Sequence, residues 1–300
     1  MRQPGSPGGG SYAFGDGTAA AKRLDLVAEV FEPPSRAFLE GVAAQMGGAA
    51  PALALALDLG CGPGHTTRLL AAVLRPRRTL GLDQSPWFVE LARAARTAAG
   101  PPIGAGAGAN ASPSARAGDR SVIAFAVHDV TATPFPEQPA DLAYCRFLAT
   151  HLRDPAAALH GWASQLTPGG WLLLDEVEAI DTSHPALRRY LDVVAALLAA
   201  RGHRLEIGAL LDRLSGPPGL VRRGSTVAPL APPLPRVAEM FGRNLAVWRA
   251  DPLLDGIASQ AELDELANQL AALTMTVPAP VPTAITWGLR QISYQRLPVG

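Results

Sequence analysis

The sequence predicts an α/β fold in three layers: a doubly wound, mostly parallel sheet of seven strands between two layers of helices. The first observation is the alternation of short apolar runs with amphipathic stretches from residue 52 to residue 178, which is typical of a parallel sheet covered on both faces. The second is the glycine-rich stretch "GCGPG" at residues 60–64, directly after the first apolar run. The third is an acid at or near the end of each of the first three expected strands: Asp58, Asp83 and Asp129.

The N-terminal elements precede the sheet. Residues 1–17 are rich in glycine and proline and are expected to be flexible. A helix is expected from Thr18 to Val30, and Pro33-Pro34 should end it because proline lacks the amide hydrogen that a helix interior uses. Ser35 is then expected to cap a second helix of about one dozen residues.

The alternating region supplies five strands, expected at residues 52–59, 78–83, 122–129, 140–146 and 171–178, and three helices, at 65–74, 86–99 and 155–166. The strands are short apolar runs, as expected for strands that are buried on both faces. Residues 100–120 contain almost no bulky side chains, so they are expected to form a flexible insertion.

The rest of the chain is less regular. Helices are expected at 185–200 and 236–249, and the capping-box residues Ser259 and Glu262 predict a third that runs to about Leu273. Two further strands, near 221–227 and within 283–297, would complete the seven. The apolar positions of the last strand change phase midway.

Composition excludes several classes of partner. Acids and bases balance at 26 each, which predicts neither a nucleic-acid surface nor an anionic membrane surface. Cys61 and Cys145 have no metal-ligand spacing, so neither a zinc site nor a disulfide scaffold is expected, and a metal is expected nowhere else. Without a long uncharged apolar segment or a signal peptide, the chain is expected to be cytoplasmic.

The glycine-rich stretch indicates a ligand that lies against bare backbone. Glycines permit a sharp turn, and the following helix directs its free amides and positive dipole end at an anionic group. A dinucleotide and S-adenosylmethionine both satisfy this pattern. Position 65 is histidine where a dinucleotide fold would have a third glycine. Three acids lie at or near the ends of the expected strands, at positions suited to such a ligand. Asp58 could accept a bond from an ammonium group, Asp83 from ribose hydroxyls, and Asp129 from an adenine amino group. A ligand that joins an amino acid to a nucleoside would use all three acids.

At this point the sequence resembles the class I S-adenosylmethionine-dependent methyltransferases. "LALDLGCGPGHTTRLLA" is similar to the first motif of that family, "TLGLDQS" to its ribose-binding segment, and "RFLATHLRDP" with "LTPGGWLLLDE" to its small-molecule members of secondary and quinone-type metabolism. The resemblance covers residues 52–178. It implies a Rossmann-like methyltransferase fold in one domain, 18–300. The cofactor-binding core would span 52–180, and residues 181–300 would supply the substrate side with a helical lid.

The resemblance also implies a cofactor site. Gly60, Gly62 and Gly64, with Asp58 in support and Cys61 packed among them, would line the methionine end of S-adenosylmethionine. Asp83 would bind the ribose and Gln84 would lie beside the adenine, whose amino group Asp129 would bind and whose ring Val130 would contact. Arg146 would lie near the sulfonium, and Tyr12 and Arg23 would close over the cofactor.

Structural roles compete with several of these assignments. Asp83 could cap the next helix, Asp129 could be a turn acid, and Arg146 could be an ion-pair partner. His151, His184 and His203 are candidates for a general base, although a packing role is favoured for His151. An apolar acceptor pocket under residues 181–213 and 232–280 is expected to use Leu210, Leu211, Met240, Phe241 and Trp248.

The expected function is methyl transfer from S-adenosylmethionine to an O, N or C atom of a small organic acceptor, by a monomer or homodimer. Two alternatives remain. A nicotinamide-dependent oxidoreductase would need a third glycine at 65 and a catalytic set such as Tyr and Lys, whereas the one lysine is Lys22. A non-catalytic S-adenosylmethionine-binding protein would carry the same cofactor motifs.

Overall fold

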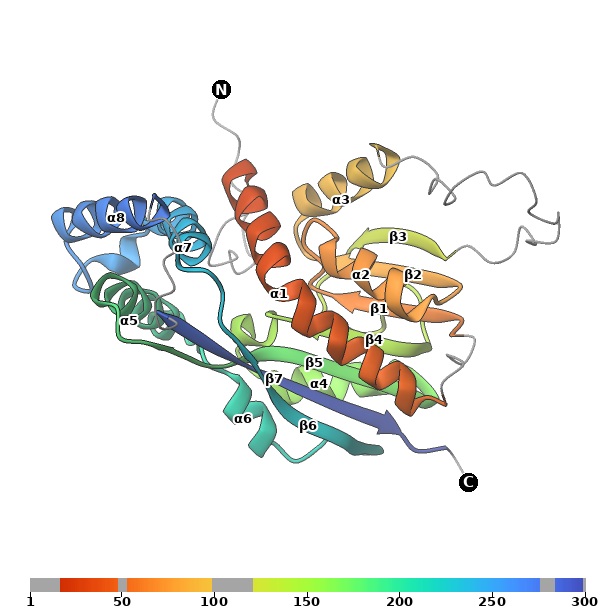
Figure 1. The fold of residues 1–300 in the computed structure, drawn as a ribbon. Helices are drawn as coiled ribbons and strands as arrows, with labels where there is room; N and C mark the ends of the chain where they lie inside the picture. The colour runs from red at the N-terminus through yellow and green to blue at the C-terminus, as the bar shows by residue number, and fades with distance from the viewer. Residues whose placement is uncertain (1–16, 48–52, 99–120, 276–283, 299–300) are drawn as a thin grey trace, which may run out of the picture.

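A computed structural model describes residues 17–47, 53–98, 121–275 and 284–298, and its centre is one sheet of seven strands. The strand order is β3-β2-β1-β4-β5-β7-β6 (Figure 1). The strands are β1 (Leu55–Leu59), β2 (Arg78–Asp83), β3 (Val122–Val127), β4 (Ala140–Arg146), β5 (Leu166–Thr182), β6 (Leu220–Leu230) and β7 (Ile285–Arg296). Strand β7 pairs antiparallel with both β5 and β6, and the pairs among β1 to β5 are parallel. The strand order reverses between β1 and β4, so the crevice beyond their carboxyl ends is where such a sheet binds ligands.

Helices cover both faces of the sheet, as expected. They are α1 (Thr18–Gln45), α2 (His65–Leu74), α3 (Pro86–Ala98), α4 (Pro155–Ser164), α5 (Pro185–Ala200), α6 (Gly208–Arg213), α7 (Leu234–Trp248) and α8 (Gln260–Thr274), with the short helices η1 (Ala149–His151) and η2 (Pro252–Leu254). In Figure 1, α1, α2 and α3 lie on one face and α4 and α6 on the other, while α5, α7 and α8 form a group beside the sheet. This group shares a hydrophobic cluster with α1 and the start of β7.

The expectation of two N-terminal helices is wrong, because α1 continues through Pro33 and Pro34. Tertiary contacts hold the segment after the prolines in place. Gln291 on β7 donates to the carbonyl of Pro34 at 3.2 Å, and Ser35 donates to Asp175 on β5 at 2.6 Å. Ser35 therefore anchors the helix to the sheet and does not cap it.

The phase change in the last strand has a simple cause. Ile285, Trp287 and Leu289 belong to the cluster with α1, α5 and α7. Farther along β7, Ile292 and Tyr294 belong to the cluster on the opposite face of the sheet. From Gln291 to Tyr294 every residue of the strand is buried, because helices cover both faces there.

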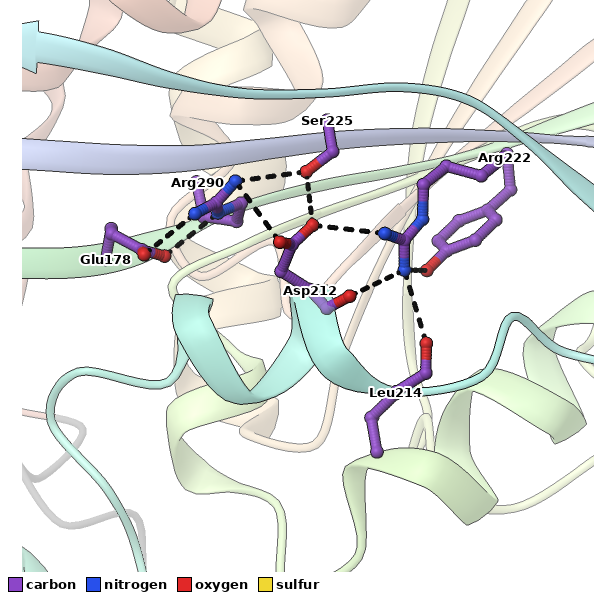
Figure 2. A network of polar contacts seen from close by, with 7 residues as sticks. Glu178, Asp212, Leu214, Arg222, Ser225 and Arg290 are labelled. Atoms are coloured by element: carbon purple, nitrogen blue, oxygen red, sulfur yellow. Dashed lines mark hydrogen bonds and ion pairs between the residues drawn. The ribbon is translucent and has the colours of Figure 1, made fainter.

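Helix α6 was not expected from the sequence, and a polar network fastens it to the sheet (Figure 2). Arg290 on β7 makes two bonds to Glu178 on β5, at 2.8 and 2.9 Å, and contacts Asp212 of α6 at 3.6 Å. Ser225 and Arg222 on β6 donate to Asp212 at 2.6 and 3.1 Å. Strands β5, β6 and β7 thus hold one short helix.

Among the described helices, none has both the length and the apolar composition that a bilayer-spanning segment requires. The capping box at Ser259 and Glu262 is confirmed at the start of α8. The segments expected to be flexible, residues 1–17 and 100–120, lie outside the described residues except for Gly17.

Candidate functional site

The glycine-rich loop connects β1 to α2 at the carboxyl edge of the sheet. Gly60, Gly62 and Gly64 have φ angles of +71°, +51° and +85°, the left-handed region that side chains rarely adopt. A Cβ at Gly64 would lie 2.7 Å from the ring of Phe125, and one at Gly60 would lie 2.9 Å from Leu148. Glycine is therefore required at these turns by backbone geometry and by close packing.

Asp83 ends β2 beside this loop. Its Oδ2 accepts the amide of Gly62 at 2.8 Å, and its Oδ1 accepts the amide of Ser85 at 2.9 Å. A carboxylate has about four acceptor positions, so one carboxylate can bind backbone amides and a ligand at the same time. Asp83 thus shapes the loop with a half-buried carboxylate, and its bond to the ribose stays a prediction.

Asp58 lies inside β1 and is 1% exposed. Its Oδ2 accepts the hydroxyls of Thr66 and Thr67, both at 2.6 Å, so it ties the first turn of α2 to the strand. Burial raises the pKa of Asp58 to about 6, against the lowering effect of the two threonine bonds. The bond from Asp58 to a ligand ammonium stays a prediction.

His65, the residue that replaces the third glycine, joins the loop to α1. Its Nε2 lies 2.9 Å from Asp25 Oδ1 on α1, and its Nδ1 lies 3.2 Å from Nη2 of Arg68. Because arginine can only donate, Nδ1 is the acceptor and Nε2 carries the proton that binds Asp25. Burial, followed by the charge of Arg68, lowers the pKa of His65. Sequence reasoning missed this pair because its members are 40 residues apart.

The residues expected around the adenine lie at the ends of β2 and β3. Gln84 is exposed. Asp129 is also exposed, and its Oδ1 accepts the amide and hydroxyl of Thr131 at 2.9 and 2.7 Å, as in a turn. Val130 is buried, and its carbonyl accepts Trp162 Nε1 at 2.8 Å. Asp129 thus has the turn role, and its role toward adenine stays a prediction.

Arg146 ends β4 next to a buried polar cluster. Its Nη1 donates to Ser35 at 3.2 Å. Asp175, fully buried, accepts from Ser35 at 2.6 Å and from Tyr144 at 3.0 Å. Burial raises the pKa of Asp175, while its hydrogen bonds and the charge of Arg146 lower it. Arg146 therefore makes a structural hydrogen bond, and its place near the sulfonium stays a prediction.

Arg23 is 5% exposed on α1 and lies between the sheet and the helical group. Its Nη1 donates to Asn244 on α7 at 3.2 Å, and Asn244 donates to the hydroxyl of Tyr190 on α5 at 2.8 Å. Arg23 therefore lies on the buried side of α1, and its closure over the cofactor stays a prediction. Tyr12, its expected companion, lies outside the described residues.

The three candidate histidines do not form one site. The rings of His151, in η1, and His203 lie 6.1 Å apart. His184 precedes α5 and His203 follows it, so a helix of about 24 Å separates them. The pKa of His151 is lowered to about 3 by burial and then by the positive charges of Arg23, His203 and Arg201.

The apolar residues expected to line an acceptor pocket pack in the core. Met240, Phe241 and Trp248 are at most 4% exposed and belong to the cluster of the helical group, where Phe241 stacks on Tyr190 at 3.9 Å. On α6, Leu211 is fully buried and Leu210 is partly buried against the same cluster. Their burial provides a rigid support for Arg23 and Asn244 and leaves these apolar side chains little surface for a ligand.

Both cysteines are buried, and burial raises the pKa of each thiol well above its usual value. Cys61 packs against Phe125 and α3 below the glycine loop. A buried, protonated thiol is a packing group and a poor nucleophile. This agrees with the packing role expected for Cys61.

Sequence reasoning also missed Glu176, a fully buried acid on β5. Its Oε1 accepts the amides of Leu148 and Ala149 at 2.9 and 2.8 Å. Burial raises the pKa of Glu176 to about 8. The signal was available, because an acid inside the apolar run "WLLLDEVE" has no reason to be there without buried partners.

The described residues fit the cofactor that the resemblance implies. Asp83 ends β2 beside the loop, the left-handed residues Gly60, Gly62 and Gly64 turn the backbone sharply, and α2 begins directly behind it. When bound, S-adenosylmethionine would supply an activated methyl group at the crevice between β1 and β4.

Comparisons with known proteins identify relatives of this chain. A family model described as a methyltransferase domain matches residues 57–174. A trans-aconitate 2-methyltransferase of Methylobacterium nodulans is 30% identical over 239 residues, which are 77% of this chain and 80% of that protein. Another, of Methylobacterium radiotolerans, is 34% identical over 142 residues, which are 47% of this chain and only 44% of that relative.

Solved structures share the fold. Coclaurine N-methyltransferase, bound to N-methylheliamine and S-adenosylhomocysteine, aligns with 87% of this chain and 72% of its own at a TM-score of 0.50 and 13% identity. A candidate methyltransferase of Bacillus halodurans aligns with 87% of this chain and 99% of its own at a TM-score of 0.51 and 15% identity.

Proposed function

This chain belongs to the class I S-adenosylmethionine-dependent methyltransferases, and we propose that it transfers the methyl group to a carboxylate oxygen of a small organic acid. The relatives named trans-aconitate 2-methyltransferases suggest such an acceptor. The observation in this chain that carries the proposal is a group of basic side chains between α1, η1 and α5, composed of the buried Arg23 and the half-buried His151 and His203.

The positive field of this group favours an anionic acceptor. The three charges that lower the pKa of His151, after burial, are all positive: Arg23, His203 and Arg201. A carboxylate placed there would gain charge-assisted hydrogen bonds, which are stronger than neutral ones. The negative charge of the carboxylate would also offset the positive charges around His151 and His203, and it would raise the pKa of both imidazoles.

The weak basicity of His151 and His203 favours the same acceptor. His151, with a pKa of about 3, is too weak a base to take a proton from an alcohol near neutral pH. Burial also lowers the pKa of His203. A carboxylate is already ionised and needs no base, so the protein has to orient it and exclude water, effects that can supply about 7–11 kcal/mol.

Different residues of the chain bind the cofactor, attract the acceptor and cover the reacting groups. Asp83 and the glycine loop hold the nucleoside and amino-acid parts of the cofactor. Arg23 attracts the carboxylate toward the crevice, and His151 and His203 offer neutral rings. Helix α1 covers the reacting groups through the pair of His65 and Asp25.

A methyl-transfer assay tests this function. With radiolabelled S-adenosylmethionine, trans-aconitate and related di- and tricarboxylates should yield methyl esters that alkali hydrolyses, and their matched amides should yield none. Arg23→Met should raise the KM for the carboxylate at least about tenfold, the value of one charge-assisted hydrogen bond. Transfer only to amines or phenols would contradict the acceptor. Cofactor binding without any transfer would favour a non-catalytic binding protein.

A further inference from the structure

The turn that connects β4 to η1, residues 147–149, forms one wall of the glycine loop. The side chain of Leu148 lies against Gly60, where a Cβ would be 2.9 Å from its Cδ1. Phe147, at the start of the turn, has a φ angle of +54°, which is unusual for a residue with a bulky side chain. Such a conformation persists only where surrounding contacts impose it.

Those contacts come from two consecutive residues of β5. The amide of Phe147 donates to the carbonyl of Asp175 at 3.2 Å. The amides of Leu148 and Ala149 both donate to Oε1 of Glu176, at 2.9 and 2.8 Å. Every amide of the turn is therefore bound by the adjacent strand, and two of the three depend on one side-chain oxygen.

Glu176 does not have the surroundings of an ordinary structural acid. The residue is fully buried, and Cys145 donates its thiol to the same Oε1 at 3.4 Å. Its second oxygen, Oε2, is also buried and has no hydrogen-bond partner among the described residues. An acid in this position is costly to bury, so the two amide bonds are the visible reason for its presence.

We propose that Glu176 is a positioning residue of the methyl transfer: by fixing residues 147–149 it sets the wall that Leu148 makes against the glycine loop and the place of His151 behind it. This inference rests on the proposed cofactor, because the wall matters only if a ligand lies against residues 60–64. A shift of residues 147–149 would change how deeply the methionine part of the cofactor can enter the site. It would also displace η1.

Two substitutions of Glu176 distinguish the effect of its hydrogen bonds from the effects of its charge and its size. Glu176→Gln keeps an oxygen for the amides of Leu148 and Ala149, so its affinity for S-adenosylhomocysteine and its kcat/KM should stay within threefold of the wild-type values. Glu176→Met keeps the length of the side chain and removes the acceptor, so affinity should fall at least tenfold, with a loss in kcat beyond the change in KM. Calorimetry and initial rates measure both.

Glu178→Met is the matched control, because this acid lies two residues farther along β5 and binds Arg290 (Figure 2). It should lower the melting temperature and leave the affinity for S-adenosylhomocysteine unchanged. Equal losses of affinity in the Gln and Met variants, or a folded Met variant with wild-type affinity, would overturn the proposal.

Two further measurements test the proposal even if Glu176→Met does not fold or if the protein does not bind S-adenosylmethionine. Leu148→Ala removes the wall itself and should weaken S-adenosylhomocysteine binding at least threefold; unchanged affinity would overturn the proposal. Hydrogen exchange at the amides of Leu148 and Ala149 should be slow in the wild type and equally slow in Glu176→Gln. Fast exchange at these amides in both proteins would overturn the anchoring. A wild-type protein that binds no S-adenosylhomocysteine but keeps these amides protected would refute the proposed function and leave the anchoring intact.

Discussion

At the scale of single residues, the candidate site contains acidic side chains that differ in how deeply they are buried. Asp83 is half-buried and binds two backbone amides at the carboxyl end of β2. Asp58 and Glu176 are buried, and burial raises the pKa of both, to about 6 and about 8. The half-buried acid is the one expected to bind a ligand, and the two buried acids organise the backbone around the site.

Replacement of Asp83 by alanine should weaken S-adenosylhomocysteine binding at least ~100-fold, because two hydroxyl bonds to a charged group are lost and the glycine loop loses its anchor. Isothermal titration calorimetry measures this. Asp141→Ala is the control: Asp141 accepts the amide of Ala54 at 2.6 Å at the opposite edge of the sheet, so it should affect stability only. Equal affinities for wild type and Asp83→Ala would contradict the site.

The buried acid Glu176 should make stability depend on pH. Its pKa is 4.5 in the unfolded chain and about 8 in the fold, so the folded state holds the proton more tightly. Its favourable contribution is complete below about pH 4.5 and is lost as the pH rises through 8. The neighbouring acid Asp175 raises the pKa further, and Cys145, whose own thiol is held protonated, donates to it.

Glu176→Gln removes this titration. The difference in melting temperature between Glu176→Gln and the wild type should therefore move in favour of the variant as the pH rises from 5 to 9. Denaturation scans at several pH values measure it. A constant difference would show that Glu176 does not change its protonation on folding.

At the scale of elements, two helices depend on distant strands. Helix α1 passes through two prolines because β5 and β7 hold it at Ser35 and Pro34. Helix α6 is only six residues long and is held by the network of Figure 2. Short or interrupted helices have little intrinsic stability, so tertiary contacts decide whether they form.

The close approach of α6 to the sheet predicts a sharp effect at Gly208. A Cβ there would lie 2.6 Å from both Arg290 Cβ and Glu178 Oε2 and 2.9 Å from Glu178 Cα. Gly208→Ala should therefore cost about 1–3 kcal/mol of unfolding free energy, measured by denaturant titration. Gly242→Ala on α7 is the control, because nothing lies within 4 Å of its Cβ position. It should be neutral or stabilising by roughly 0.5–1 kcal/mol.

At the scale of the whole molecule, the crevice is assembled from both ends of the described chain. Helix α1 contacts the glycine loop through Asp25 and His65, and it contacts α7 through Arg236 and Glu29, whose charged groups lie 3.0 Å apart. Helix α7 packs in turn against α5 and α8 in one hydrophobic cluster. Binding at the glycine loop should therefore stabilise the helical group as well as the sheet.

S-adenosylhomocysteine at 100 times its dissociation constant should raise the unfolding free energy by about 2.7 kcal/mol, since it binds the folded state alone. A thermal shift measures this increase. The nicotinamide dinucleotide NAD should produce no shift, because His65 and its partner Asp25 occupy the place of the third glycine. A shift with NAD and none with S-adenosylhomocysteine would favour the oxidoreductase alternative.

The sequence by itself determined the fold class, the five strands from β1 to β5 and the family. These features are local: each strand, its terminal acid and the following glycine or helix lie within a few residues, so periodicity and turn chemistry are visible in the chain. Only the tertiary structure decided that α1 is continuous, that His65 binds Asp25, that His184 lies apart from His151, and that Glu176 holds the wall of the glycine loop. These depend on buried partners far away along the chain, and only packing selects which distant polar groups meet.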